Sequence, residues 1–178
     1  LQSAIRVGFP AVSRHHEDYP AFYIANMILG GYFGSRLMQN IREDKGYTYG
    51  IGSSINQLKD LSFAVISTQV GAKHTEATMT EINYEVNRLR EELVSVEELD
   101  LVKNYTAGDL LMNFDGTFSQ ASLIQTMLTN QLPESYYSDF LNKIYTIEPA
   151  HVLRVAQKYF DLEKFTIAIV GDGFSDNA

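Results

Sequence analysis

Residues 30–52, GGYFGSRLMQNIREDKGYTYGIG, constrain the fold of this 178-residue chain more than any other segment. They begin with a glycine-rich bend and continue into a short amphipathic helix that we expect to end near Arg42. Gly46 follows, and glycine tolerates the backbone conformations that end helices. Residues 47–49, Tyr-Thr-Tyr, favour a strand. The segment therefore predicts a helix and a strand joined by a tight turn, with an arginine and a tyrosine seven residues apart across it.

The rest of the chain separates its predicted strands from its predicted helices. Alternation of apolar and polar side chains and β-favouring composition predict strands over residues 4–9, 47–58, 61–70 and 165–170. A hairpin turn is expected at Lys59-Asp60. Apolar spacing of three and four predicts helices over residues 18–29, 35–42, 75–93, 95–112, 117–130, 136–145 and 149–160. Segregated strands and helices predict an α+β fold, with an antiparallel sheet and helices packed on one face, in a single domain over residues 1–178.

Polar residues mark the starts of several of these helices. Asp18 is the expected N-cap of the first one, with Pro20 in its first turn. The patterns Ser95 to Glu98 and Thr117 to Gln120 predict capping boxes, in which two side chains satisfy backbone N–H groups reciprocally.

Composition excludes several classes of protein. A formal net charge of -8 argues against a nucleic-acid partner, because phosphate binding needs a basic surface. The absence of cysteine excludes disulfides, thiolate metal sites and a cysteine nucleophile. No apolar run approaches the roughly 20 residues of a membrane helix, and the chain begins at Leu1 without a signal-peptide pattern. We expect a soluble fragment of a longer chain with no membrane partner; its compartment is not readable from the sequence.

The glycines at positions 30, 31 and 34 do not form a phosphate-binding loop. No Gly-Lys-Ser/Thr follows them, and they join two predicted helices instead of following a strand. We expect them to allow a sharp bend between those helices.

Several motifs together resemble the M16 (pitrilysin/insulinase-type) zinc metallopeptidases, and in particular their C-terminal domain that binds no zinc. Members often show a Gly-Gly cluster, a Ser-Arg-Leu step and the pattern R-E-x-[KR]-G-x-x-Y, found here at residues 30–31, 35–37 and 42–49. The KYF and TIAIVGD segments near the chain's end are similar to the family's final helix and strand. The resemblance covers nearly the whole chain and implies a half-domain like those of LuxS and the mitochondrial processing peptidase.

The resemblance also implies a site. In active members the residues matching Arg42 and Tyr49 face the zinc from the opposite half, where they bind substrate and stabilise the oxyanion. The chemistry suits them, since tyrosine donates a hydrogen bond while neutral and arginine offers a charged planar fork. Tyr47, on the same expected strand face as Tyr49, is a second candidate for substrate binding. The alternative is that neither residue has a functional role. Arg42 in the last turn of a helix would then interact favourably with the negative end of the helix dipole, and Tyr49 would be an ordinary strand residue.

The sequence departs from the zinc-bearing half of the family. Its four histidines, His15, His16, His74 and His151, form no H-x-x-E-H motif. His15 and His16 could bind a surface metal, but solvated loop residues are the simpler interpretation. A zinc ion and a general base would therefore come from an H-x-x-E-H-bearing half, in the same chain or a separate one, and this segment alone is expected to be inactive.

Two functions follow from this resemblance. The first is the zinc-free half of a metalloendopeptidase that closes a chamber around peptide substrates; a homodimer is a further arrangement that it allows. The alternative is a non-catalytic structural or peptide-binding subunit of a processing or respiratory-type complex.

Residues 76–100 hold eight acidic residues against Arg88 and Arg90. We expect this stretch to be chiefly a solvated helix face, and the alternative is an acidic chamber wall that prefers basic peptides.

Overall fold

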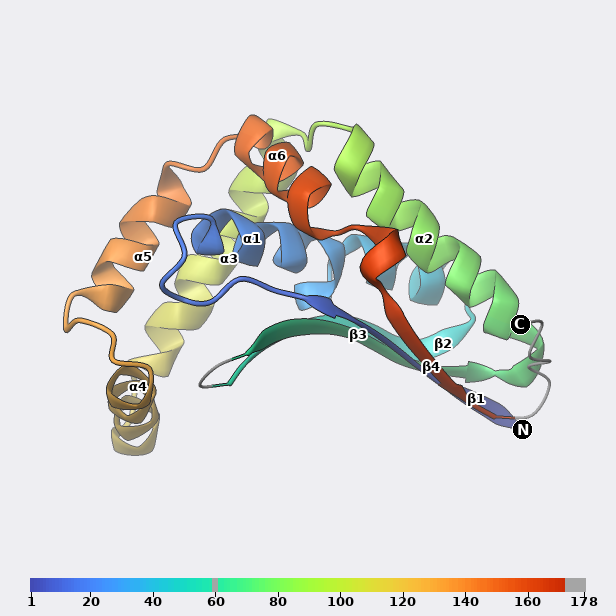
Figure 1. The fold of residues 1–178 in the computed structure, drawn as a ribbon, viewed down its shortest axis with the longest axis horizontal. Helices are drawn as coiled ribbons and strands as arrows, with labels where there is room; N and C mark the ends of the chain where they lie inside the picture. Colours follow the sequence, from blue (N-terminus) through green and yellow to red (C-terminus); the bar gives the residue numbers. More distant parts are fainter. Residues whose placement is uncertain (59–60, 172–178) are drawn as a thin grey trace.

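A four-stranded sheet forms the base of the structure, a computed structural model that describes residues 1–58 and 61–171 (Figure 1). In spatial order the strands are β2 (Thr48–Gln57), β3 (Ser62–Gly71), β1 (Gln2–Pro10) and β4 (Thr166–Val170). Every neighbouring pair is antiparallel. The four expected strands are thus confirmed. The turn expected at Lys59-Asp60 lies outside the described residues, but Gln57 pairs with Ser62 as a hairpin requires.

One face of the sheet is buried and the other is free. Successive side chains of a strand point to opposite faces, so Ile5, Val7 and Phe9 of β1 all lie in the core. Arg6, between them, is exposed on the opposite face. This free face is the side from which a substrate or a second domain could approach the sheet.

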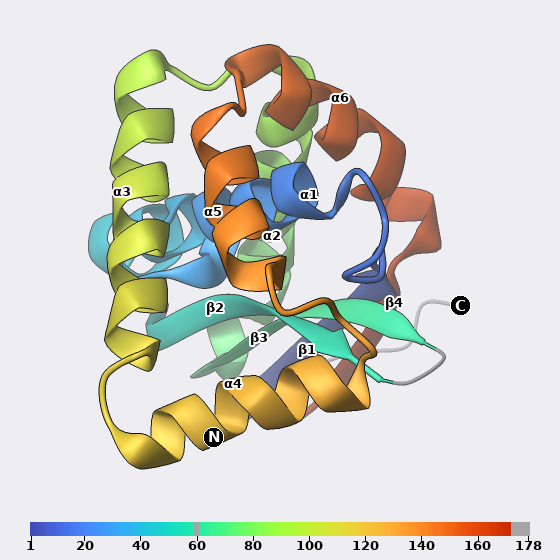
Figure 2. The same cartoon turned by 90° about the vertical axis from the view of Figure 1, so that its left-hand side faces the viewer.

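The helices gather on the buried face, as the sequence predicted (Figures 1 and 2). Those that cover it are α1 (Tyr19–Asn26), α2 (Thr75–Glu91), α3 (Val96–Asn113), α5 (Tyr136–Tyr145) and α6 (Pro149–Tyr159). In contrast, α4 (Thr117–Thr129) stands apart near the tip of the β2–β3 hairpin, and all its residues are half-buried or exposed. None of the described helices is long and apolar enough to cross a membrane.

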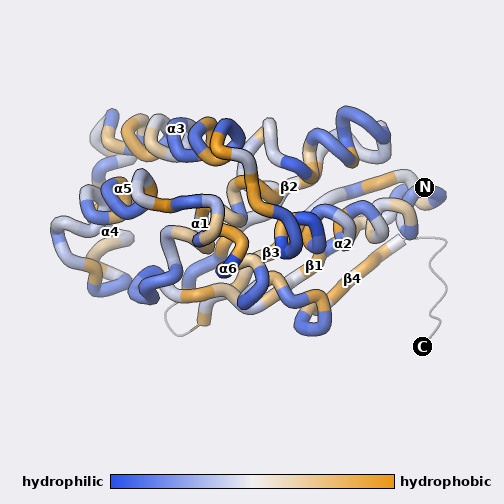
Figure 3. The backbone as a smooth tube through the Cα atoms, turned by 90° about the horizontal axis from the view of Figure 1, so that it is seen from above, coloured by the Kyte–Doolittle hydropathy of each residue, from blue (hydrophilic) through white to orange (hydrophobic). Residues whose placement is uncertain are grey.

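The core lies between the helices and the sheet. Phe9 of β1 packs against Phe160, with 5.1 Å between ring centroids, and Phe160 packs against Phe22 of α1 at 5.2 Å. Figure 3 shows hydrophobic residues along β4, and hydrophobic residues that alternate with hydrophilic ones along the helices. Each large apolar side chain that is fully buried in the core, such as Phe22 or Phe160, contributes about 1.5–3 kcal/mol.

Asp18 is the N-cap residue of α1 and Pro20 lies in the first turn, as predicted, but the side chain does not act as a cap, and the cap predicted at Thr117 is wrong. The Asp18 side chain makes no cap hydrogen bond within the described chain. It instead accepts hydrogen bonds from Arg154 (2.6 Å), Lys158 (3.0 Å) and Tyr159 (2.7 Å) at the end of α6. Thr117 is the first residue of α4, not its cap, because Gly116 precedes it with a φ of +89° that favours glycine.

The third cap is half confirmed. Ser95 accepts the backbone N–H of Glu98 at 3.1 Å, as a capping residue should. The Glu98 carboxylate does not turn back to the Ser95 N–H, because both its oxygens accept hydrogen bonds from Arg36, at 2.8 and 2.7 Å. A tertiary ion pair therefore replaces the local half of the capping box.

Candidate functional site

The glycine bend brings the first helix into close contact with the sheet. Helix α1 continues into a π-helical turn, η1 (Met27–Gly31). A Cβ atom on Gly30 would lie 2.8 Å from the backbone N and 2.9 Å from the Cβ of Ser53 in β2. Gly30 is thus required by a close approach to the strand, which is a more specific reason than the expected bend.

The helix that carries Arg42 has a second π-helical segment, η2 (Met38–Asp44). Leu37 and Ile41 anchor it in the core. Gly46 then adopts a φ of +66°, and the chain turns into β2. The predicted order of helix, glycine and strand is confirmed. The π form was not expected, and such segments are frequent at functional sites.

Arg42 lies at the end of this helix and packs against its own segment. Its guanidinium carbon is 4.7 Å from the centroid of the Phe33 ring, and Nη1 is 2.8 Å from Oε1 of Glu43. The side chain remains 32% exposed. Because an ion pair this exposed contributes little stability, Arg42 could exchange Glu43 for another acceptor at small cost.

Tyr49 projects into solvent from an irregularity at the start of β2. The register of β2 against β3 shifts between Thr48 and Ile51, as in a β-bulge. The Thr48 hydroxyl donates to the carbonyl of Gln69 at 2.7 Å and accepts the N–H of Gly50 at 3.1 Å. With both neighbours held in this way, the Tyr49 side chain is 95% exposed.

A shallow hollow of about 290 Å³ adjoins Tyr49. Its walls include Gln2, Arg6, Ser67 and Gln69, which alternate with buried residues of β1 and β3 and so belong to the free face of the sheet. Sequence reasoning missed these residues as part of the site. The sequence did contain a signal for them. Polar and apolar residues alternate along β1, so the polar residue Arg6 must lie on the face opposite to the core.

The expectation that Tyr47 shares a strand face with Tyr49 is wrong. Tyr47 precedes β2 and packs partly against the core, where its ring stacks on His74 with 4.5 Å between centroids. The bulge that follows breaks the simple alternation on which the expectation depended. The structure records no hydrogen bond or ion pair between Arg42 and Tyr49, both of which lie in its described part.

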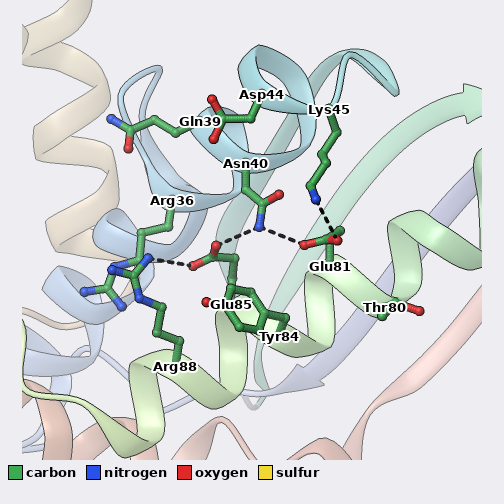
Figure 4. Close-up of a pocket in the computed structure, with 10 residues that line it drawn as sticks. All are labelled: Arg36, Gln39, Asn40, Asp44, Lys45, Thr80, Glu81, Tyr84, Glu85 and Arg88. Carbon is green, nitrogen blue, oxygen red and sulfur yellow. Dashed lines mark hydrogen bonds and ion pairs between the residues drawn. The ribbon is translucent and has the colours of Figure 1, made fainter.

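Behind Arg42, a polar cleft of about 530 Å³ separates η2 from α2 (Figure 4). Asn40 donates to Glu81 at 3.0 Å and to Glu85 at 2.8 Å, and Lys45 lies 3.4 Å from Glu81. Glu85 is only 3% exposed, so this residue does not belong to the chiefly solvated acidic face that the sequence predicted. These contacts hold η2 against α2.

The described residues contain no group of three or more His, Cys, Asp or Glu side chains placed to hold a metal. In the His15-His16 loop, Nε2 of His15 lies 2.8 Å from the carbonyl oxygen of Asn130. Nδ1 of His16 accepts the N–H of Asp18 at 3.0 Å. The donor set of this loop therefore does not suit a catalytic zinc ion, which needs three protein ligands and an open position.

These features define a class of protein: an α+β half-domain that presents a tyrosine and a free sheet face without a metal centre in its described part. A family model described as the peptidase M16 inactive domain matches residues 2–106, which is more than half of the chain. The chain therefore belongs to the M16 peptidase family, as the motifs around Arg42 indicated.

Individual relatives agree with this assignment. The chain is 28% identical over 121 residues to the uncharacterized zinc protease YmxG of Bacillus subtilis, covering 68% of this chain and 30% of that one. It is 23% identical over 160 residues to the non-peptidase homolog YmxG of Helicobacter pylori, covering 90% and 37%. The chain thus spans about a third of these curated relatives.

A solved structure supports the fold over the full length of the chain. The M16 inactive domain from Pseudomonas fluorescens matches with a TM-score of 0.86 and 26% identity, covering 99% of this chain and 42% of that one.

Proposed function

We propose that this chain is the zinc-free half of an M16-type metalloendopeptidase, and that it closes a chamber and orients peptide substrate through Tyr49 and Arg42. The observation that carries the proposal is the exposure of Tyr49, at 95%, beside a polar hollow on the free face of the sheet. The bulge holds this large aromatic side chain outward, and among the described residues it forms no hydrogen bond or aromatic contact that would explain its position. Such exposed residues on a rigid scaffold are typical of binding sites.

The two side chains have complementary tasks in this proposal. The neutral Tyr49 hydroxyl donates a hydrogen bond to the substrate carbonyl oxygen. This hydrogen bond becomes stronger as negative charge develops on that oxygen. The Arg42 guanidinium leaves Glu43 and donates to backbone carbonyls of the extended peptide. A zinc ion in the opposite half would supply Lewis-acid activation of water.

The second candidate function is a structural or peptide-binding subunit without catalysis. It is favoured by the description of one relative as a non-peptidase homolog. The two functions differ in what the partner half contains. An H-x-x-E-H motif in that half supports catalysis, and its absence supports the subunit role.

Zinc content and peptide hydrolysis of the complete gene product, set beside the 178-residue chain, test the proposal. We expect zinc and turnover in the complete protein and neither in the chain alone. We also expect the double variant Arg42→Ala/Tyr49→Phe of the complete protein to lose turnover while keeping its zinc. A complete protein without zinc would favour the subunit role, and tight zinc binding by the 178-residue chain would contradict its assignment as the zinc-free half.

A further inference from the structure

A cavity of about 260 Å³ lies within the helical layer, where α1, α3, α4 and α5 meet. It is formed by elements other than those that carry Arg42 and Tyr49. Its wall is strongly aromatic and includes the rings of Tyr19, Tyr23, Tyr136, Tyr137 and Phe140. A pocket of this composition and size suits a small molecule with an apolar or aromatic body.

A single arginine brings positive charge into this aromatic wall. The guanidinium carbon of Arg14 lies 5.7 Å from the centroid of the Tyr19 ring, and its Nε is buried with no hydrogen-bond partner in the described part of the chain. Asp109 also lines the cavity, but it is exposed, and the ion pairs of the described residues include none between it and Arg14. Arg14 thus has no carboxylate partner among the described residues, and a half-buried cation is costly unless an anion compensates it.

The hydrogen bonds formed among the described residues include none to two buried hydroxyl groups of the same cavity. They belong to Tyr136, 9% exposed, and Thr106, 3% exposed. Burial raises the pKa of Tyr136, although the nearby Arg14 opposes this effect, so its phenol stays protonated and able to donate at neutral pH. Leaving such groups unsatisfied is unfavourable, because each has lost its hydrogen bonds to water on burial. Together with Arg14, these two residues line one cavity and carry hydrogen-bond donors.

We propose that this cavity binds a small monocarboxylate carried on an apolar or aromatic body. The guanidinium fork matches the two oxygens of a carboxylate, and one positive charge suits one negative charge. The hydroxyls of Tyr136 and Thr106 complete the coordination of the same oxygens, while the tyrosine rings pack against the ligand's body. This inference is independent of the peptidase function proposed above.

Benzoate titrated into the 178-residue chain tests the site, with amide chemical shifts followed by NMR and benzyl alcohol as the uncharged comparison. We expect saturable one-to-one binding of benzoate, with shifts concentrated around Arg14, Thr106 and Tyr136. Benzyl alcohol should bind at least tenfold more weakly, because it cannot form the charged pair. Absence of saturation up to about ten millimolar, or shifts concentrated elsewhere, would overturn the proposal.

Variants separate recognition from general packing. Arg14→Gln should weaken benzoate binding by roughly tenfold or more, and Tyr136→Phe and Thr106→Val by several-fold each. The matched control is Arg90→Gln, because Arg90 is also half-buried with an unpartnered Nε but does not line this cavity. If Arg14→Gln fails to fold, the two hydroxyl variants decide the outcome. Equal affinity in all folded variants would contradict the proposed coordination.

Discussion

Tyr49 owes its exposure to the residues beside it. Thr48 holds Gly50 through its hydroxyl, and Thr68 donates to the carbonyl of Gly50 at 2.9 Å. Both contacts depend on the bulge, which tilts the intervening residue away from β3. The position of this tyrosine is therefore a property of a small hydrogen-bonded unit, and its function can be altered without disturbing the core.

The turn that precedes this unit depends on a single glycine. Gly46 has a φ of +66°, and a Cβ atom there would meet nothing within 4 Å. We therefore expect Gly46→Ala to lower the free energy of unfolding by about 1 kcal/mol, entirely through backbone strain. Gly50→Ala is the control, because a Cβ there also meets nothing within 4 Å and its φ is not positive. Chemical denaturation measures both, and equal losses would contradict the argument.

Asp18 gives the fold a dependence on pH. Burial would raise the pKa of this carboxyl, but hydrogen bonds from Arg154, Tyr159 and Lys158 outweigh it and hold the pKa well below its usual range. A depressed pKa contributes stability above about pH 4, where the unfolded carboxyl is ionised, and this stability is lost as the pH falls further.

We expect Asp18→Asn to cost about 2 kcal/mol at pH 7, because the charged hydrogen bonds are weakened. The difference in unfolding free energy between the two proteins should shrink as the pH falls from about 5 towards 2. Denaturation curves across this range test the prediction. A difference that does not change with pH would show that Asp18 acts through packing alone.

Two π-helical segments meet β2 and determine where the site residues lie. The first, η1, contacts β2 through Gly30, and the second, η2, carries Arg42 into the turn before β2. Contacts from Asn40 and Lys45 to α2 hold the opposite side of η2. The site is therefore positioned from both sides of its helix, by the sheet and by α2.

Gly30→Ala tests this packing at the level of the elements. The added methyl group would meet the Ser53 backbone N at 2.8 Å, which no side-chain rotation can relieve, so η1 and β2 must separate. We expect a loss of about 1–3 kcal/mol in the free energy of unfolding. An unchanged thermal midpoint would mean that η1 and β2 can separate without cost.

At the level of the whole molecule, the sequence predicted the architecture well. Segregated periodicities predicted an α+β fold with helices on one face, and the structure confirms it. Local spacing was sufficient for the elements that bury a regular stripe, as residues 5, 7 and 9 of β1 do.

The sequence could not predict features that depend on distant partners. The Asp18 side chain binds α6, more than 130 residues away, instead of capping α1. The Glu98 carboxylate binds Arg36, 62 residues away, instead of completing the capping box. The bulge beneath Tyr49 depends on hydrogen bonds to β3. Tyr47 was wrongly placed on the same face as Tyr49 because that expectation used the alternation of a regular strand, which the bulge interrupts. The aromatic cavity around Arg14 draws residues from the loop before α1 and from several helices, and no sequence motif marks it.

The catalytic efficiency of Tyr49→Phe in the complete protein tests the central claim most directly. Removing this single hydroxyl should lower kcat/KM for peptide hydrolysis by roughly 100-fold or more, the usual cost of losing one oxyanion donor. Tyr145→Phe is the control, since Tyr145 is an exposed tyrosine at the end of α5. Equal activity of the two variants would contradict the proposed role of Tyr49.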